Sequence, residues 1–316
     1  MSKQRDFDGF DSLFNYSDYM NRKKREKASQ SFILKIIVLI ITSAVLLLTL
    51  NSKSDLESLY TKSGRYPFSM MTFNVGNGNC VLVSCEGKNI LADCGRELVQ
   101  FDILEALDCL GVEKLDLVIL THPDKDHIGS MSEVAENVRI DRFLTCENGD
   151  YEITEYYGEL LSVLGERGIE VEYAHADDMI ELGELSVEVI SPSKVYNSSN
   201  ENSVAVKLSY GNFSALLMGD AGQKAESDIV RSGKDISADV LLVGHHGSAG
   251  SSSEEFLNAV KPGYALLSVS ENDTLPSDKA LKRILDCGCE ILRTDRSGNI
   301  LVVYDDRNGV SVFTDR

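Results

Sequence analysis

The sequence predicts an α/β fold: an αββα sandwich, in which two packed β-sheets carry helices on their outer faces, preceded by one N-terminal transmembrane helix. Two observations predict it. Residues 68–316 alternate short apolar runs with amphipathic stretches, hairpin-rich at first and then mixing strands with helices. Residues 32–50 are almost entirely apolar. We therefore expect a cytoplasmic tail over 1–30, a transmembrane helix over 31–50, a linker over 51–67 and one domain over 68–316.

The apolar run from Phe32 to Leu50 contains a single charge, Lys35, close enough to one end for its long side chain to reach the headgroups. A basic cluster from Arg22 to Lys27 lies just before it. Because positive charge favours the cytoplasmic side, we expect a single-pass protein of the cell membrane, with the N-terminus inside and the domain outside. A cleaved signal peptide is the alternative, but Leu46–Asn51 lacks the small residues of a cleavage site.

Charge is distributed unevenly along the chain. The 316 residues carry a net charge of −19, and residues 51–316 hold 23 bases against 45 acids, a net charge near −22. Such a domain repels polyanions, which argues against a general nucleic-acid binder. It does not exclude a site that meets phosphate through metal ions. The seven cysteines form no paired C-x-x-C groups, so they do not predict structural zinc, and Cys287-x-Cys289 alone is weak evidence for any site.

Apolar runs bounded by turn residues predict the strands of the domain. They are 70–75, 80–84, 89–92, 115–120, 185–190, 204–210, 213–218, 239–243 and 264–268. Amphipathic spacing predicts the helices. They are 101–110, 153–164, 223–231, 253–260 and 277–287. Ser252 with Glu255 three residues later predicts a capping box at the start of the fourth helix.

Histidine and aspartate gather where predicted strands end. The segment from His122 to His127 follows a buried strand and holds two histidines and two aspartates. A second strand runs into His245 and His246, a third ends at Asp220, and a fourth ends at Asp93. Imidazole and carboxylate suit zinc, manganese or iron, and loops at strand ends can bring them together. The sequence therefore predicts a metal centre rather than a polar surface turn.

The ordered set of motifs resembles the metallo-β-lactamase superfamily, whose central motif is H-x-[HD]-x-D-H. The segments that carry the resemblance are V-G-N-G (75–78), L-A-D-C-G (91–95), T-H-P-D-K-D-H-I-G (121–129), N-S (202–203), M-G-D (218–220), H-H-G-S (245–248) and T-D…G (294–298). The chain looks most like the hydrolase domain of ComEC-type DNA-uptake proteins, in which the second ligand is Asp rather than His.

The resemblance implies two divalent metal ions, Zn or Mn. It places His122 and Asp124 on one, and Asp126, His127 and His246 on the other, with Asp220 bridging them. The order of the two adjacent histidines stays open, but we expect His246 to be the ligand and His245 to contact substrate phosphate. Asp126, His245 and Asp220 are the catalytic candidates. Supporting or substrate contacts are implied for four further residues: Asp93, which would orient a ligand histidine, and Asn202, Ser203 and Ser248.

The chain also departs from the family pattern. The opening motif usually reads D-V-G-Q-G-D-A, whereas Asn74 and Asn79 replace its two acids. The later His-Pro pair has lost its histidine, because Leu275 precedes Pro276. No histidine occupies the usual third-ligand position, where Asn202 and Ser203 stand. These departures leave room for a weakly held metal or an inactive relative.

We expect a membrane-anchored, metal-dependent hydrolase that uses metal-bound hydroxide, most consistent with a phosphodiesterase or nuclease acting on a phosphoester substrate. Two metals lower the pKa of a bound water and stabilise charge on the attacked and leaving oxygens. Two alternatives remain: hydrolysis of a lactam, lactone or thioester, and a pseudoenzyme that serves as a cell-surface binding module. The sequence leaves the oligomeric state open.

Overall fold

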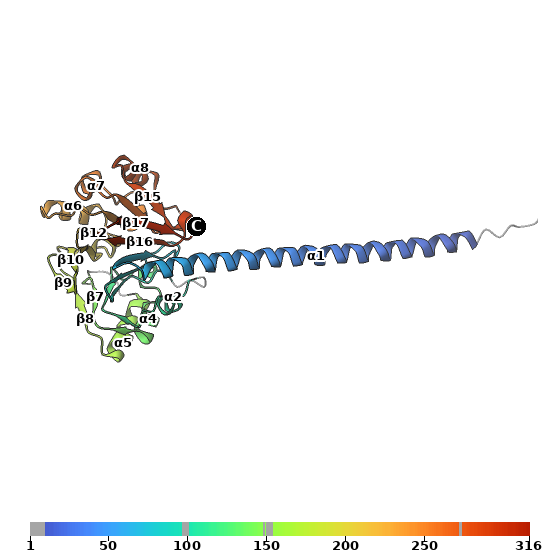
Figure 1. Ribbon diagram of the computed structural model, residues 1–316, viewed down its shortest axis with the longest axis horizontal. Helices are drawn as coiled ribbons and strands as arrows, with labels where there is room; N and C mark the ends of the chain where they lie inside the picture. Colours follow the sequence, from blue (N-terminus) through green and yellow to red (C-terminus); the bar gives the residue numbers. More distant parts are fainter. Residues whose placement is uncertain (1–9, 97–100, 148, 150–153, 272–273) are drawn as a thin grey trace, which may run out of the picture. The chain divides into compact units, whose positions relative to one another are not determined.

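The computed structural model describes residues 10–96, 101–147, 149, 154–271 and 274–316, with the backbone alone for 10–17, 26, 28, 29, 31 and 44–55. It divides into two compact units, Met1–Ser54 and Asp55–Arg316. Helix α1 (Phe10–Ser63) belongs to both (Figure 1).

Helix α1 includes the predicted transmembrane residues 31–50, but the side chains of 31 and 44–50 lie outside the described ones. Among the side chains that are described, no helix has an apolar stretch long enough to cross a membrane. The helix also continues through most of the predicted linker and ends at Ser63. Leu59 is buried against the domain, so the last turns of α1 are held by packing rather than exposed as a polar connection.

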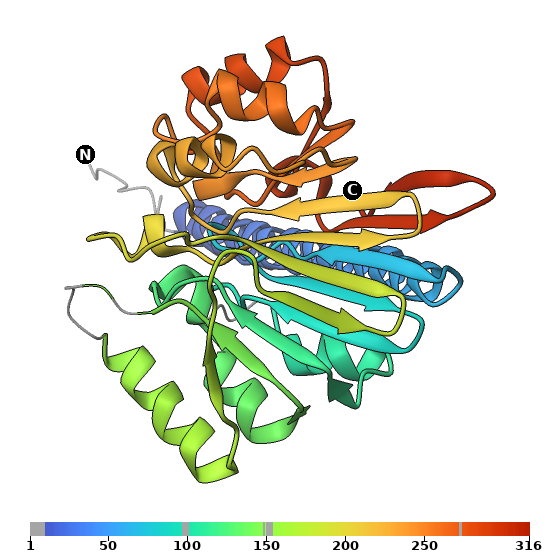
Figure 2. The ribbon, with the colours of Figure 1, turned by 90° about the vertical axis from the view of Figure 1, so that its left-hand side faces the viewer.

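Two sheets form the centre of the Asp55–Arg316 unit (Figure 2). The first has the order β17-β16-β1-β2-β3-β5-β7-β8. Its strands are β1 (Phe68–Thr72), β2 (Val81–Cys85), β3 (Lys88–Ala92), β5 (Leu117–Leu120), β7 (Phe143–Thr145), β8 (Val171–Tyr173), β16 (Ile300–Asp305) and β17 (Gly309–Thr314). Two further short strands, β4 (Lys114–Leu115) and β6 (Arg139–Ile140), form a separate two-stranded sheet.

The second sheet has the order β15-β14-β13-β12-β11-β10-β9. Its strands are β9 (Met179–Leu182), β10 (Leu185–Ser191), β11 (Ala205–Tyr210), β12 (Phe213–Leu217), β13 (Val240–Leu242), β14 (Tyr264–Leu267) and β15 (Glu290–Arg293). Both sheets are mixed. Strands β3, β5, β7 and β8 run parallel in the first, and β12 to β15 run parallel in the second.

Helices cover the outer face of each sheet. They are α2 (Ile103–Cys109), α3 (Lys125–Ile128), α4 (Met131–Asn137), α5 (Glu155–Arg167), α6 (Gln223–Arg231), α7 (Glu254–Val260), α8 (Asp278–Asp286) and α9 (Thr294–Ser297), with 3-10 turns η1 (Asn200–Asn202) and η2 (Gly244–Gly247).

Three apolar clusters account for this layering. One joins inward-facing residues of the two sheets, such as Met70 and Val206. The second packs α2, α4 and α5 on the first sheet, and the third packs α6, α7 and α8 on the second. Burying one face of α2 and of α4 to α8, together with both faces of the central strands, is the αββα arrangement that the sequence predicted.

The strands and helices predicted within residues 68–316 are present among the described residues, with ends that shift by a few residues; residue 153, the predicted start of the second of these helices, lies outside the described ones. The capping box was placed one residue too early. Ser253, not Ser252, caps α7 by accepting a hydrogen bond from the Phe256 N–H at 3.4 Å. The Ser252 backbone has a positive φ of 56°, and its N–H donates to the buried Glu226 carboxylate, so it cannot serve as the cap.

Candidate metal centre

The carboxyl ends of the parallel strands carry the candidate metal ligands, which is where ligands bind in open α/β sheets. Strand β5 ends at Leu120 and leads through Thr121 to His122. The chain then turns into the short helix α3, which carries Asp126 and His127 on its first turn. The His122 and His127 rings lie 4.1 Å apart, centroid to centroid, and the Nε2 atom of His122 is 3.6 Å from Oδ2 of Asp124.

Asp220 lies between the histidines of the two sheets. It follows β12 after Gly219, whose φ of +53° and missing side chain let the chain pass close to Thr121 and Ser203. Its Oδ1 lies 3.2 Å from Nε2 of His127 and 3.5 Å from Nε2 of His246. Its Oδ2 lies 3.9 Å from Nε2 of His122. One carboxylate is therefore within reach of histidines from both sheets.

The third part of the centre is the turn η2, which follows β13. His245 and His246 both have left-handed backbones, with φ near +50°, an arrangement that is costly for residues other than glycine. The Nδ1–H of His246 faces the Ser268 carbonyl oxygen at 2.8 Å, which directs its Nε2 inwards, 3.6 Å from Oδ2 of Asp126. His245 is about one third exposed, and its Nε2 lies 3.8 Å from Oδ2 of Asp220.

Buried polar groups fix the other two histidines. Oδ2 of Asp93 lies 2.7 Å from Nδ1 of His127, and the same carboxylate accepts hydrogen bonds from the N–H and hydroxyl of Thr121 at 2.8 and 2.9 Å. The Ser203 hydroxyl lies 3.3 Å from Nδ1 of His122 and accepts the Asp220 N–H at 2.9 Å. Each ring is thus held through Nδ1, and each Nε2 is left to face Asp220.

The family model described as the metallo-beta-lactamase superfamily matches residues 73–271, more than half of the chain. The chain belongs to the metallo-β-lactamase superfamily. It is 31% identical over 210 residues to "ComE operon protein 3" of Bacillus subtilis (strain 168), an alignment that covers 66% of this chain and 27% of that protein. It is 30% identical over 235 residues to "Competence protein ComA" of Neisseria gonorrhoeae, covering 73% of this chain and 31% of that protein.

These relatives are ComEC-type competence proteins, and the chain spans less than a third of the length of either. Among solved structures, the metallo-beta-lactamase fold protein YhfI from Bacillus subtilis is 14% identical, with a TM-score of 0.47, over 72% of this chain and 96% of that one.

In the metallo-β-lactamase site, neighbouring charges shift the pKa values of the acids and of His127. Burial alone would raise the pKa of the Asp220 carboxyl, but the charges on His127 and His246 outweigh it and lower that pKa. Burial likewise opposes the shift at Asp126, where the nearby His246 ring and the charge on His127 lower the pKa to about 2. Burial would lower the pKa of His127, yet the charges of Asp220 and Asp93 hold it well above its usual value. The carboxylates are therefore held ionised, as cation binding requires.

Four buried atoms of the site have no hydrogen-bond partner among the described residues: Nε2 of His122, His127 and His246, and Oδ1 of Asp220. Leaving buried polar atoms unpaired is costly, so such a cluster indicates groups that bind something else. Two sets of ligand atoms each lie within 4.8 Å of one another, His122 with His127 and Asp220, and Asp126 with His127 and His246. Both sets include His127, and imidazole and carboxylate donors of this kind suit divalent cations.

The remaining predicted residues lie near this cluster in different roles. The side chain of Asn202 is engaged by the backbone of Tyr196, accepting its N–H at 2.6 Å and donating to its carbonyl oxygen at 2.7 Å, so it shapes the loop. Ser248 ends the turn η2, where its N–H donates to the His245 carbonyl oxygen. His175, outside the cluster, is largely exposed, and its Nε2 lies 3.6 Å from Oε1 of Glu147.

Sequence reasoning missed Asn200. Its side-chain Nδ2 lies 3.2 Å from Nε2 of His245, at the partly exposed side of the cluster. It also missed Ser268, which holds His246 through its carbonyl oxygen and donates its hydroxyl to the Gly78 carbonyl oxygen at 2.5 Å. Neither residue type is a typical metal ligand, so only the geometry reveals them.

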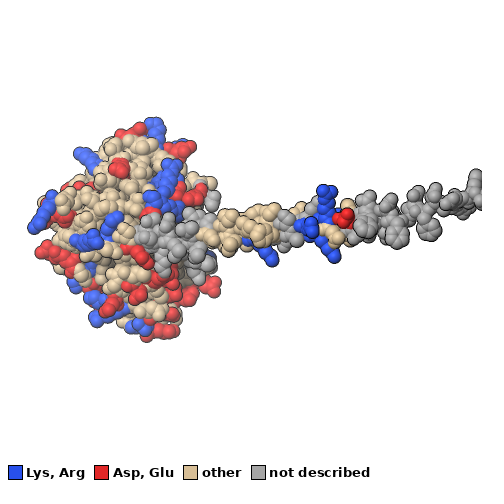
Figure 3. Space-filling view, turned by 45° about the vertical axis from the view of Figure 1, so that its right-hand side comes forward, with Lys and Arg blue, Asp and Glu red and all other residues tan. Residues whose placement is uncertain are grey.

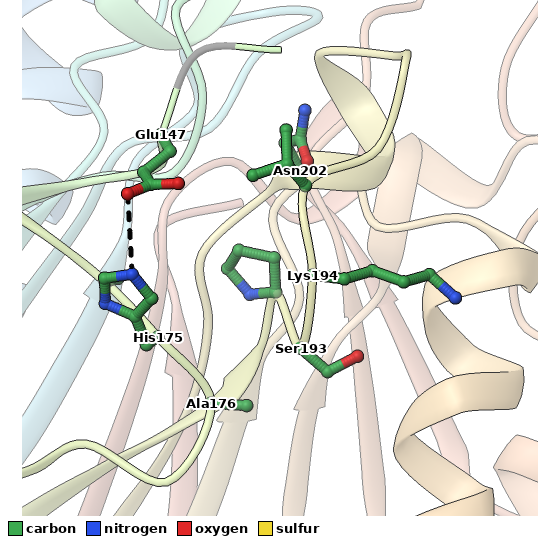
Figure 4. Close-up of a pocket in the computed structure, with 9 residues that line it drawn as sticks. Glu147, His175, Ala176, Ser193, Lys194 and Asn202 are labelled. Carbon is green, nitrogen blue, oxygen red and sulfur yellow. Dashed lines mark ion pairs between the residues drawn. The ribbon is translucent and has the colours of Figure 1, made fainter.

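A cavity of about 230 Å³ opens on the same edge of the fold (Figure 4). Its lining comes from the segments after β7, β8 and β10 and from η1, and includes Glu147, His175, Ser193, Lys194 and Asn202. Because β5, β7 and β8 are successive strands of one sheet at about 4.8 Å spacing, the segment after β7 begins about 5 Å, and the segment after β8 about 10 Å, from the segment that starts at Thr121. Asn202 directly precedes Ser203, which contacts His122.

Proposed function

We propose that this chain is a metal-dependent hydrolase of phosphodiesters. The observation that carries the proposal is the convergence of three buried histidine Nε2 atoms on the Asp220 carboxylate, where none of them has a hydrogen-bond partner among the described residues. Nothing in a purely structural cluster would require Nδ1 of every ring to be fixed while Nε2 is left unpaired. A pair of divalent cations, Zn or Mn, satisfies all of these atoms at once.

The residues divide naturally between two cations. His122 and Asp124 would hold one, Asp126, His127 and His246 the other, and Asp220 would lie between them. When bound, such a pair supplies an acidified water and positive charge for the attacked and leaving oxygens. Asp93, Ser203 and Ser268 keep the rings oriented, and His245 is the one histidine of the cluster with enough exposure to meet a substrate oxygen.

The choice of a phosphodiester rests on the likeness to competence proteins over 66–73% of this chain. Charge limits that choice. Acidic and basic side chains are interspersed on the domain face shown in Figure 3, and residues 51–316 carry a net charge near −22. We therefore favour a short or locally bound phosphodiester over a long polyanion that would follow an extended basic surface.

The test is metal-dependent hydrolysis by the full chain in detergent. We expect bis(p-nitrophenyl) phosphate to be hydrolysed after loading with Mn²⁺ or Zn²⁺, and Asp220→Asn and Asp126→Asn each to lower the rate by at least about 100-fold, because even supporting residues are worth 10–100-fold. Asp178→Asn, which removes an exposed carboxylate beside His175, is the matched control and should keep full activity.

The same assay separates the alternatives. Turnover of a lactam, lactone or thioester with none of the phosphodiester would replace the proposed substrate class. Two bound metal ions without turnover of any ester would favour the cell-surface binding module. Asn74, Asn79 and Leu275, which replace the two acids and the histidine of the family pattern, support this alternative. Failure to bind metal at all would end the enzyme proposal.

We also propose that residues 31–50 anchor the chain in the membrane, with the domain outside. The support is the apolar sequence between Phe32 and Leu50 and the basic cluster before it. The full chain should stay in the membrane fraction after alkaline carbonate washing, and added protease should cleave the domain in intact cells. Release by carbonate, or protection of the domain from protease, would contradict this proposal.

A further inference from the structure

The turn between α8 and β15 brings two thiols into contact, far along the chain from the metal ligands. The Sγ atoms of Cys287 and Cys289 lie 3.5 Å apart, and both residues are half-buried. Gly288, between them, has a φ of +84°, a left-handed conformation that folds the chain back on itself. Both thiols also lie close to the Ile284 carbonyl oxygen, which is 3.0 Å from Sγ of Cys287 and 3.5 Å from Sγ of Cys289.

The other cysteines differ in their surroundings. Cys80, Cys85, Cys94 and Cys146 are buried, and Cys109 is exposed. Among the described residues, Cys287 and Cys289 are the cysteines whose sulfur atoms face each other at contact distance. Half-burial leaves this pair open to a small reagent, whereas the buried thiols are shielded. Proximity is what lets a second thiol displace a mixed disulfide before another molecule can do so.

We propose that Cys287 and Cys289 form a thiol–disulfide exchange site that is oxidised as a pair by low-molecular-weight disulfides. This inference does not depend on the proposed function. One thiolate attacks a sulfur of the reagent R–S–S–R, forming a mixed disulfide and releasing R–S⁻. The second thiolate then attacks the Sγ atom of the first cysteine in that mixed disulfide, closing the Cys287–Cys289 bond and releasing the second R–S⁻. The two thiol protons end on the two released thiols.

The surroundings favour an order for these steps. Burial and the hydrogen bond with Cys287 raise the pKa of Cys289 to about 12, which makes it the poorer nucleophile. Cys287 therefore attacks first, and Cys289 resolves the mixed disulfide. The resulting ring contains only Gly288 between its cysteines, so the disulfide should be easier to reduce than one that joins distant segments.

Trypsin isolates the pair without any mutation. Cleavage after Arg283 and Arg293 gives a peptide, Ile284–Arg293, whose only cysteines are Cys287 and Cys289, and Cys109 falls in a separate peptide, Glu97–Lys114. The folded full chain should be incubated with oxidised glutathione, quenched by alkylation and analysed by mass spectrometry. We expect Ile284–Arg293 to lose two hydrogens and take up no glutathione, while the Cys109 peptide gains one glutathione.

Single variants check the mechanism. In Cys289→Ser the peptide should instead accumulate a glutathione adduct on Cys287, because no second thiol is present to displace it, and Cys287→Ser should react more slowly than Cys289→Ser. Two separate adducts in the unmodified chain, or alkylation of both thiols while Cys109 is oxidised, would overturn the proposal. Protection from alkylation that a chelator abolishes would also overturn it, since the pair would then be holding a thiophilic metal ion.

Discussion

The buried carboxylate of Asp93 lies 2.7 Å from Nδ1 of His127, and it determines which nitrogen of that ring faces the metal centre. Asp93 is itself held by the N–H and hydroxyl of Thr121, the residue just before His122. One acid from the end of β3 therefore orients groups that follow β5. The arrangement makes metal affinity depend on a residue that does not face the cations.

We expect Asp93→Asn to lower metal affinity by about 10–100-fold, the usual effect of removing such a supporting partner. The amide can still meet Thr121, but it lacks the charge that favours a protonated Nδ1 and a free Nε2. Competition between the protein and a chelating dye for Zn²⁺ or Mn²⁺ would measure the change. Asp178→Asn, beside the exposed His175, should leave affinity unaltered, and equal losses in both variants would contradict the assignment.

Asn200 should matter for turnover rather than for metal content. Its Nδ2 lies 3.2 Å from Nε2 of His245, the most exposed histidine of the cluster. Removing it in Asn200→Ala should lower kcat/KM for a phosphodiester by about tenfold, as expected for one lost hydrogen bond of about 1–1.5 kcal/mol. Steady-state kinetics at full metal loading would test this, with Asn308→Ala as a distant control. An unchanged kcat/KM would show that the contact has no part in the reaction.

We expect Gly219→Ala to destabilise the protein because the added Cβ would clash with neighbouring atoms. Gly183, which also has a positive φ but has free space around it, provides the control. Gly219 and Gly183 both have positive φ, +53° and +67°. A Cβ on Gly219 would lie 2.8 Å from Cβ of Thr121, whereas one on Gly183 would meet nothing within 4 Å. Gly183→Ala should thus cost only about 1–2 kcal/mol of backbone strain, and Gly219→Ala should cost more and also weaken metal binding. Denaturant unfolding followed by circular dichroism would measure both, and equal costs would argue against the clash.

Asp116, which lies away from the metal centre, makes a pH-dependent contribution to the stability of the domain. Its buried carboxylate accepts hydrogen bonds from Lys88 at 2.9 Å, Lys114 at 2.7 Å and the Asn89 N–H at 3.1 Å. Burial raises its pKa, but these contacts, Lys114 first, outweigh burial and lower it. A lowered pKa means that the stabilisation is fully present above the unfolded value, near 4, and is lost as the pH falls through the folded value.

Asp116→Asn should therefore destabilise the domain at pH 7 by about 1–3 kcal/mol, and the difference from the unmodified chain should shrink below about pH 4. Urea unfolding at several pH values would give the curve. Glu166→Gln, on the exposed side of α5, is the control and should show no such trend. A difference that grows as the pH falls would show that the sign is wrong.

The sequence predicted the strand ends well because the buried strands are continuous apolar runs, and polar residues directly after them stand out. Asp93, His122 and Asp220 were found in this way. Strands β15 and β17 were missed because they lie at sheet edges and are only partly buried, and Glu290 of β15 is exposed. The short strands β7, β8 and β9 and the buried apolar strand β16 were also missed. Edge strands such as β15 and β17 have no strong apolar alternation to reveal them.

The site was predictable only as far as its residue types were distinctive. Asn200 lies 45 positions before His245, and they meet because η1 leads into β11 while His245 follows β13, with β12 between these strands. No pattern in one sequence encodes that crossing. The error at Ser252 has a similar origin, since the Glu226 carboxylate that occupies its N–H comes from α6.

The left-handed backbones of the adjacent residues His245 and His246 imply that this turn is strained and that contacts with the surrounding structure hold it in place. A residue without a side chain would relax it, so His245→Gly should yield a protein that melts at a higher temperature while working less well. Selecting this chain for heat resistance alone would then tend to erode the turn that holds His245, the histidine proposed to contact the substrate. At position 245, thermal stability and activity are therefore expected to oppose each other.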